Sequence, residues 1–258
     1  MWEKQLAVAI KAGELAKKDI LKIYKSNFKI ELKKDKSPVT TADKKADKTV
    51  SKYLKSAYPT YAILSEESKD NKARLSNDFV WVIDPLDGTT NFIDKNEEFT
   101  INIALVHKHK VVVGVIIIPI TGEIYYATDH GGAFYSHNGS VEEIHVSRNK
   151  KTIRALLSRS HHSEREEKVF EKYNGRIISK KYVGAAIKAC LIAKGEAELS
   201  IGLNDKTKEW DTAASQILLK EAGGVFFEPK GTWLKYNRKD TTNRKGYVMA
   251  NKKRNILF

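Results

Sequence analysis

An apolar run that leads directly into two carboxylates limits what this chain can form around residue 84. Residues 80–83 are typical of a buried strand, and Asp84 and Asp87 follow on either side of Pro85. Open α/β sheets usually bind ligands at the ends of such strands. Pro85 lacks an N–H and Gly88 tolerates unusual φ angles, so we expect a turn that brings carboxylates and carbonyls together. Such oxygen ligands suit Mg²⁺, although an ordinary acidic turn explains this segment equally well by itself.

The composition is that of a globular protein. With 258 residues, 41% of them hydrophobic, the chain can bury a substantial core in one large domain or two smaller ones. Its longest apolar stretch, residues 111–120, is shorter than the ~20 residues that span a bilayer. The first residues lack a signal-peptide pattern, so we expect a cytoplasmic protein without a membrane partner. The single cysteine, Cys190, agrees with a reducing compartment and has the apolar neighbours of a buried thiol.

The formal net charge of +14 raises the alternative of nucleic-acid binding, because clustered basic residues neutralise phosphates. The lysines are instead spread along the chain, and no basic block is interleaved with aromatic residues. We therefore predict a solvated lysine-rich surface that attracts anionic small molecules and has no specific nucleic-acid partner.

The periodicity of apolar residues divides the chain into two parts. Apolar positions at helical spacing predict a helix over residues 2–25 and a second after Pro38, capped by Thr40 or Thr41, with Asp43 in its first turn. Strands of a largely antiparallel sheet are predicted at 61–64, 79–83, 99–106, 111–119, 124–128 and 133–136. Beyond about residue 145 the pattern is α/β, with strands at 153–158, 176–179, 197–201, 225–228 and 247–250 and helices at 164–173, 184–194 and 211–222. We expect an N-terminal α+β part, residues 1–145, which carries the metal site, and a C-terminal α/β part, residues 146–258, which carries substrate-binding elements.

Four further segments carry acids or hydroxyls, namely residues 37–43, 64–68, 158–161 and 209–214. Together with the Asp84 turn they resemble the Mg²⁺-dependent, lithium-sensitive phosphatases of the inositol monophosphatase superfamily over nearly the whole chain. The most specific matches are Asp-Pro-Leu-Asp-Gly-Thr at 84–89 and Trp-Asp-Thr-Ala-Ala at 210–214. The resemblance implies an α+β or α/β fold, a layered αβαβα sandwich with the active site between the two parts.

Within the superfamily, three segments are most similar to the CysQ-type 3′(2′),5′-bisphosphate nucleotidases: residues 96–105, 157–161 and 184–193. Two features depart from that subfamily. Thr90 and Asn91 stand where it usually has Lys-Glu, and they are typical of inositol monophosphatases. Ala185 and Ala186 replace two expected serines.

The resemblance implies a set of metal ligands. Glu66, Asp84 and the carbonyl of Leu86 would hold one Mg²⁺, and Asp84, Asp87 and Asp211 a second, with Asp84 bridging the two. Glu66 would also support a third ion, which gives two to three per site. Such a cluster repels itself when empty, so Mg²⁺ should bind partly because it relieves that repulsion.

The resemblance also implies catalytic and substrate-binding roles. Thr89, paired with Asp43, would orient the attacking water, with Glu66 as the third catalytic residue. Gly88 and Thr89 would offer N–H groups to the phosphate if they open a helix. The remaining substrate-binding residues would be Ser158, Ser160, His161, Gly184 and Lys188, the last near a second phosphate.

Simpler alternatives exist for several of these side chains. Asp43 and Asp211 could be helix-start charges alone. Lys188 could face solvent, and Glu67 could be either a solvated neighbour of Glu66 or one that supports it from behind.

The predicted function is Mg²⁺-dependent hydrolysis of the 3′-phosphate of adenosine 3′,5′-bisphosphate to AMP and phosphate. This family activity clears a by-product of sulfate assimilation, and lithium should inhibit it. One alternative is an inositol or sugar monophosphatase, which Thr90 and Asn91 favour. Another is a basic, non-catalytic nucleotide or nucleic-acid binder. The assembly state is left open, with a homodimer as one alternative.

Overall fold

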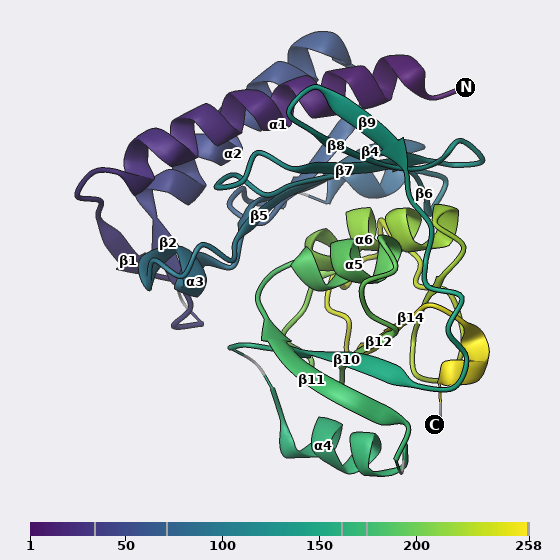
Figure 1. Ribbon diagram of the computed structural model, residues 1–258. Coiled ribbons are helices and arrows are strands. Elements are labelled where there is room, and N and C mark those ends of the chain that lie inside the picture. The colour runs from purple at the N-terminus through teal and green to yellow at the C-terminus, as the bar shows by residue number, and fades with distance from the viewer. Residues whose placement is uncertain (34, 71, 161, 174, 257–258) are drawn as a thin grey trace.

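The computed structural model describes residues 1–33, 35–70, 72–160, 162–173 and 175–256, and these form five layers (Figure 1). Helices α1 (Glu3–Tyr24) and α2 (Thr41–Ala57) cover the outer face of a seven-stranded sheet. Helices α5 (Ile187–Ala193) and α6 (Glu209–Glu221) lie between this sheet and a five-stranded sheet, and α4 (Glu164–Glu171) covers the far face of the latter. The predicted αβαβα sandwich is confirmed.

Both N-terminal helices form where apolar periodicity predicts them. Ala9, Ala12, Ala16 and Ile20 are the buried stripe of α1. Helix α2 begins after Thr40, whose side chain accepts a hydrogen bond from Ala42 N, as expected of an N-cap threonine. The two helices pack their buried stripes together on one face of the sheet.

The seven-stranded sheet has the order β3-β4-β5-β6-β7-β8-β9. β3 runs parallel to β4, and the other neighbours are antiparallel, as predicted for a meander. Its strands are β3 (Ala62–Ser65), β4 (Phe79–Asp87), β5 (Thr100–His107), β6 (Lys110–Ile117), β7 (Ile124–Thr128), β8 (Gly132–His137) and β9 (Ser140–Glu143).

Both faces of the central strands are buried. In β4, Trp81 and Ile83 pack in the core beneath α1 and α2, whereas Val80 and Val82 pack in the core that contains α5 and α6. Side chains alternate between the faces of a strand, so a continuous apolar run is what burial on both faces requires.

The five-stranded sheet has the order β11-β10-β12-β14-β13. β10 pairs in parallel with β11 and β12, while β14 pairs antiparallel with β12 and β13. The strands are β10 (Ile153–Ser158), β11 (Ile177–Val183), β12 (Leu199–Gly202), β13 (Val225–Phe227) and β14 (Tyr247–Ala250).

Several predicted details are wrong, each for a local reason. The strand before the acids does not end at Ile83, because β4 continues through Pro85 to Asp87 and absorbs the proline in a register shift. The helix predicted from Gly184 begins at Ile187, because Ala185 has a left-handed φ of 51°. Three short strands were not predicted, namely β1 (Ile30–Leu32), β2 (Pro38–Thr40) and β9. Every residue of β1 and β9 is exposed, so these two strands have no burial pattern, and β2 has only three residues.

The division of the chain near residue 145 stays a prediction. β9 ends at Glu143 and β10 begins at Ile153, so the sheets do separate there in sequence. One continuous apolar core nevertheless joins them through α5 and α6.

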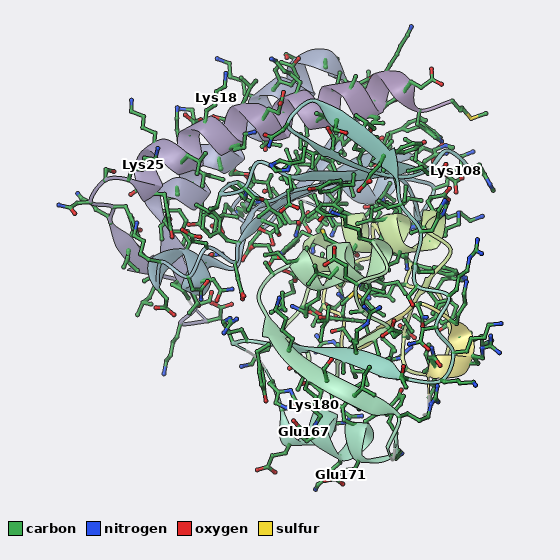
Figure 2. All side chains as sticks on the ribbon, in the orientation of Figure 1. Lys18, Lys25, Lys108, Glu167, Glu171 and Lys180 are labelled. Carbon is green, nitrogen blue, oxygen red and sulfur yellow. The ribbon has the colours of Figure 1, made fainter. Side chains whose placement is uncertain are left out.

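Charged side chains project from many separate parts of the molecule (Figure 2). Lys18 and Lys25 extend from α1, Lys108 from the turn before β6, and Lys180 from β11 at the opposite end. Among the described helices, none is both long enough and apolar enough to span a bilayer.

Candidate active site

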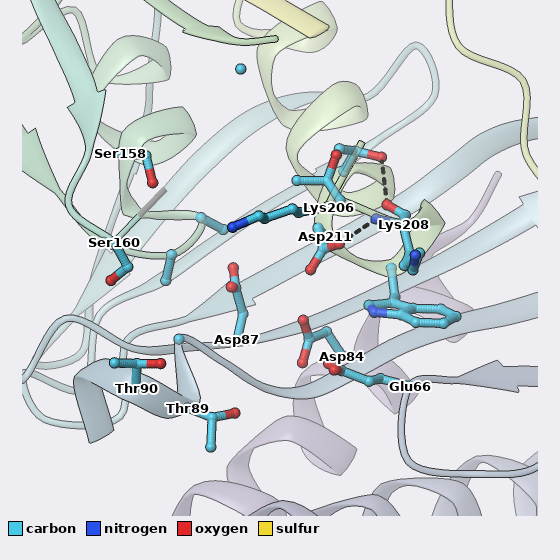
Figure 3. Close-up of a pocket in the computed structure, with 18 of the residues that line it drawn as sticks. Glu66, Asp84, Asp87, Thr89, Thr90, Ser158, Ser160, Lys206, Lys208 and Asp211 are labelled. Carbon is cyan, nitrogen blue, oxygen red and sulfur yellow. Dashed lines mark hydrogen bonds between the residues drawn. The ribbon is translucent and has the colours of Figure 1, made fainter. Parts of the chain in front are cut away.

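A pocket of about 860 Å³ opens where the two sheets approach each other. The connection between β1 and β2, the ends of β3 and β4, and α3 (Thr89–Ile93) line one side. The end of β10, the turn at residues 184–186, α5 and the start of α6 line the other. Figure 3 shows the labelled carboxylates of Asp84, Asp87 and Asp211 facing one another in this pocket.

The three aspartates form a cluster with metal-ligand spacing. Each offers one carboxylate oxygen, and these oxygens lie within 4.8 Å of one another. Asp84 is buried: its Oδ1 accepts a hydrogen bond from Leu86 N (3.1 Å), while Oδ2 has no donor among the described residues. Asp87 Oδ2 accepts from Asn102 Nδ2 (3.1 Å) and Thr100 Oγ1 (3.4 Å), and Asp211 Oδ2 accepts from Lys208 N (2.5 Å).

The irregularity in β4 explains why Asp84 and Asp87 meet. In a regular strand, residues three apart point to opposite faces. Here Asp84 pairs with Asn102 and Asp87 with Thr100, so β4 has one more residue between its paired positions than β5. The bulge at Pro85 and Leu86 therefore turns the second carboxylate toward the first.

The electrostatics of the cluster favour a bound cation. Burial, followed by the repulsion of Glu66 and Asp87, raises the pKa of Asp84 well above its usual value. Burial and the charges of Asp87 and Glu66 do the same to the pKa of Asp211. Close carboxylate oxygens that repel one another, among them a buried Asp84 oxygen without a donor in the described part of the chain, fit a hard divalent ion such as Mg²⁺.

Glu66 lines the same pocket and is held by a lysine that the sequence did not single out. Lys33 Nζ, from the connection between β1 and β2, donates to Glu66 Oε1 (2.7 Å) and Glu67 Oε1 (2.6 Å). Of the two alternatives for Glu67, the structure favours a supporting neighbour of Glu66 over a solvated one, since its side chain is 8% exposed and shares Lys33 with Glu66. Burial raises the pKa of Glu67 to about 7, although Lys33 opposes the shift.

Thr89 and Asp43 form the predicted pair. Thr89 Oγ1 donates to Asp43 Oδ1 (2.8 Å), and the Leu86 carbonyl lies 3.3 Å from the same hydroxyl. Asp43 Oδ2 accepts from Thr40 N and Thr40 Oγ1 at the start of α2. Asp43 is thus a helix-start charge and a partner of Thr89 at once.

Asp211 and Gly88 each lie at the start of a helix beside the pocket. Asp211 likewise caps α6 while facing Asp84 and Asp87, so the two alternatives for it coexist. Gly88, with φ of 91°, precedes the helix that begins at Thr89, as expected.

The predicted substrate-binding residues surround the acids on the opposite wall. Ser158 and Ser160 border the pocket, and Ser160 Oγ lies 3.5 Å from Asn91 Oδ1. Gly184 N donates to Glu98 Oε2 (2.7 Å). His161 lies outside the described residues. The substrate contacts of all these residues stay predictions.

Lys188 does not face solvent, so that alternative is wrong. Its side chain is buried, and Nζ donates to the carbonyls of Ala185 (2.8 Å) and Val183 (3.2 Å). Burial lowers its pKa, and Asp87 opposes the shift. The lysine thus places a positive charge inside the pocket wall.

Known proteins match nearly the whole length of the chain. A sequence profile of the inositol monophosphatase family matches residues 1–256. The chain belongs to the inositol monophosphatase family. The 3′(2′),5′-bisphosphate nucleotidase CysQ of Salmonella typhimurium is 32% identical over 250 residues, which cover 96% of this chain and 98% of that relative. An inositol monophosphatase of Dictyostelium discoideum is 38% identical over 221 residues, or 82% of this chain and 80% of the relative.

A solved structure of a family member has the same fold. The crystal structure of CysQ from Bacteroides thetaiotaomicron superimposes with a TM-score of 0.85 at 31% identity, covering 97% of this chain and 98% of that one. Inositol monophosphatase family members with both kinds of name therefore resemble this chain over most of its length.

Proposed function

We propose that this protein is a Mg²⁺-dependent phosphatase that removes the 3′-phosphate of adenosine 3′,5′-bisphosphate, yielding AMP and inorganic phosphate. The observation that carries the proposal is the cluster of Asp84, Asp87 and Asp211. One oxygen of each lies within 4.8 Å of the others, and the buried Asp84 Oδ2 has no donor among the residues that the structure describes. The CysQ relatives supply the choice of substrate.

The acids would hold two to three Mg²⁺ ions. Glu66, Asp84 and the Leu86 carbonyl would bind one, Asp84, Asp87 and Asp211 a second, and Glu66 would contribute to a third. Bound Mg²⁺ supplies charge neutralisation for the phosphoryl oxygens and acidifies water near them. Lys33 would have to share Glu66 with a metal ion, because its ammonium now contacts that carboxylate.

The protein's own groups would orient the attacking water. Thr89 donates its hydroxyl proton to Asp43, so its oxygen lone pairs are left to accept a hydrogen bond from water. Asp43 is in turn fixed by Thr40, which prevents its carboxylate from rotating away. As a water held by Thr89 attacks phosphorus, it would pass a proton to the Thr89 oxygen while Thr89 passes its own proton to Asp43. The bond between phosphorus and the 3′ oxygen of the nucleotide would break, and that oxygen would take a proton from solvent to become the hydroxyl of AMP.

The opposite wall would bind the rest of the substrate. Lys188 places a positive charge next to Asp87, and Ser158, Ser160 and Gly184 lie on the same side of the pocket. A second phosphate of a nucleotide bisphosphate is a partner of the right charge for this wall. His161 is included by resemblance alone.

A second candidate function, hydrolysis of inositol or sugar monophosphates, is favoured by two observations. Thr90 and Asn91 have the inositol monophosphatase form, and the Dictyostelium relative of that name is 38% identical. Side-by-side phosphate release from adenosine 3′,5′-bisphosphate, inositol 1-phosphate and fructose 1,6-bisphosphate with Mg²⁺ separates the two. We expect the highest kcat/KM for the nucleotide, and a clear preference for inositol phosphate contradicts the proposal.

The same assay addresses the non-catalytic binder. Replacing Asp87 with Asn should abolish phosphate release, whereas a pure binder releases none from the start. Cytoplasmic location, clearance of a sulfate-assimilation by-product, lithium inhibition and a homodimer stay predictions.

A further inference from the structure

Glu98 joins three segments beside the active site without belonging to the acid cluster. It lies between α3 and β5. Its Oε2 accepts hydrogen bonds from Arg159 Nε (2.6 Å) and Gly184 N (2.7 Å), and its Oε1 accepts from Arg159 Nη2 (2.7 Å). Arg159 follows β10 and Gly184 follows β11, so one carboxylate ties the ends of two neighbouring strands to the segment that leads into β5.

The ion pair of Glu98 and Arg159, called the clamp below, fixes the position of the turn but adds little to the free energy of unfolding. Arg159 also donates to the carbonyl of Tyr182 (2.9 Å), so its guanidinium is fixed from two sides. The side chains of Arg159 and Glu98 are 42% and 22% exposed, and ion pairs with that exposure contribute little to stability. Burial raises the pKa of Glu98, but Arg159 and the Gly184 N–H outweigh burial and leave it below its usual value. Glu98 is therefore ionised at neutral pH.

The turn at residues 184–186, which Glu98 holds, is packed tightly against Gly88 and Asn91. A Cβ atom on Gly184 would lie 2.1 Å from Asn91 Nδ2 and 2.8 Å from the Glu98 carbonyl oxygen. A Cβ atom on Gly88 would lie 3.4 Å from Ala185 Cβ. Ala185 has φ of 51°, a region that residues with a side chain adopt only when their surroundings impose it. The contacts with Glu98 and Asn91 are surroundings of that kind.

The turn reaches the acid cluster through the residues that follow it. The Ala186 N–H hydrogen-bonds to Asp87. Lys188 donates to the Ala185 carbonyl (2.8 Å) and lines the pocket together with Asp87. The orientation of the turn thus decides whether the Ala186 N–H reaches the Asp87 carboxylate.

We propose that Glu98 is a positioning residue for the metal site: with Arg159 it holds the turn at residues 184–186 in place, and the turn then holds the Asp87 carboxylate in the orientation that a divalent cation needs. The inference rests on the proposed metal-dependent function.

The test compares two arginine-glutamate clamps of the same form. In the second clamp, Glu198 accepts from Arg154 Nη2 (2.6 Å), Arg154 Nε (3.1 Å) and Arg154 N (2.8 Å), and neither residue lines the pocket. The variants are E98A, E98Q and R159M, with E198Q as the matched control. The primary measurement is the thermal unfolding midpoint as a function of MgCl₂ concentration, which needs no catalysis, and phosphate release is measured alongside it.

We expect E98A to raise the half-saturating Mg²⁺ concentration about tenfold, the lower end of the effect of removing a group that supports a metal ligand. E98Q and R159M should fall between E98A and the unchanged protein, because Gln still accepts the Gly184 N–H. E198Q should lower the midpoint in EDTA but leave the half-saturating concentration unchanged. At saturating Mg²⁺, most of the kcat of E98A should return.

An unchanged half-saturating concentration in E98Q and R159M overturns the positioning role, and so does an equal shift in E198Q. Absence of any Mg²⁺-dependent rise in the unchanged protein overturns it as well, because there is then no metal site to position. If the unchanged protein binds Mg²⁺ but releases no phosphate from any substrate, the proposed function fails while the midpoint series still decides the role of Glu98.

Discussion

Replacing Asp84 with Asn should stabilise the metal-free protein while removing its response to Mg²⁺. The carboxylate oxygens of Asp84, Asp87 and Asp211 lie within 4.8 Å of one another, so each ionised pair costs about 3.5 kcal/mol at an effective dielectric constant of 20. Asn keeps an oxygen to accept the Leu86 N–H, and its NH₂ group replaces an oxygen that has no donor among the described residues. The new donor faces two carboxylates that can accept from it.

Protonation of the cluster relieves part of the repulsion, as the raised pKa values of Asp84 and Asp211 indicate. We therefore expect a gain of about 1–3 kcal/mol in the free energy of unfolding at pH 7 in EDTA, or about 2–4 °C in Tm for each kcal/mol. In Mg²⁺ at 100 times its Kd, the unchanged protein should gain about 2.7 kcal/mol and the variant almost nothing.

Chemical and thermal unfolding in EDTA and in MgCl₂ measure both effects. Asp47→Asn is the control, because Asp47 is a buried carboxylate that accepts hydrogen bonds from Ser65 (2.5 Å) and Ser68 (2.7 Å). It should lose stability in EDTA and keep its response to Mg²⁺. An Asp84→Asn variant that is less stable than the unchanged protein in EDTA contradicts the expected repulsion among the three carboxylates. A variant that gains as much stability from Mg²⁺ as the unchanged protein contradicts the expected role of Asp84 in binding Mg²⁺.

Three further predictions concern catalysis, pH and packing. Thr89→Ala should lower kcat by about 10²-fold or more with a smaller change in KM, since general-base assistance is worth that much. The control is Thr49→Ala, which removes a similar hydrogen bond to Asp19 (2.6 Å) and should leave kcat unchanged. The pKa of Glu67 is raised from 4.5 to about 7, so between these pH values the folded metal-free protein binds more protons than the unfolded chain. Its free energy of unfolding should therefore fall as pH rises from 4.5 to about 7. Glu67→Gln should flatten this pH profile, as measured by denaturant titrations. Gly114→Ala should lower the free energy of unfolding by about 1–3 kcal/mol, because its Cβ would lie 2.9 Å from a backbone oxygen of α6, and an unchanged Tm contradicts this.

The layers of the fold were predictable where burial leaves a period in the sequence. β7, β10 and β14 match their predicted bounds residue for residue, because their flanking turns are polar and their cores apolar. The β1–β2 hairpin has no such period, since Ile30 and Leu32 are 51% and 71% exposed. The bulge at Pro85 was also missed, because a proline after an apolar run indicates a turn more often than a strand that continues.

Sequence motifs predicted the ligands of the candidate metal site, but they did not predict the side chains that support those ligands. Asp84, Asp87 and Asp211 belong to two short segments that resemble a known family. Lys33 contacts Glu66 across 33 positions of sequence, and Glu98 contacts Arg159 across 61. Neither partner belongs to a pattern that marks it locally, and the sheet packing alone brings them together.

Crystals grown with Mn²⁺ in place of Mg²⁺, with anomalous diffraction measured at the manganese edge, show directly whether these carboxylates hold divalent cations. We expect at least two anomalous peaks in the pocket, both in contact with Asp84. One should also be ligated by Asp87 and Asp211, and the other by Glu66 and the Leu86 carbonyl. Crystals at millimolar Mn²⁺ without a peak at these carboxylates, or with peaks elsewhere alone, contradict this expectation.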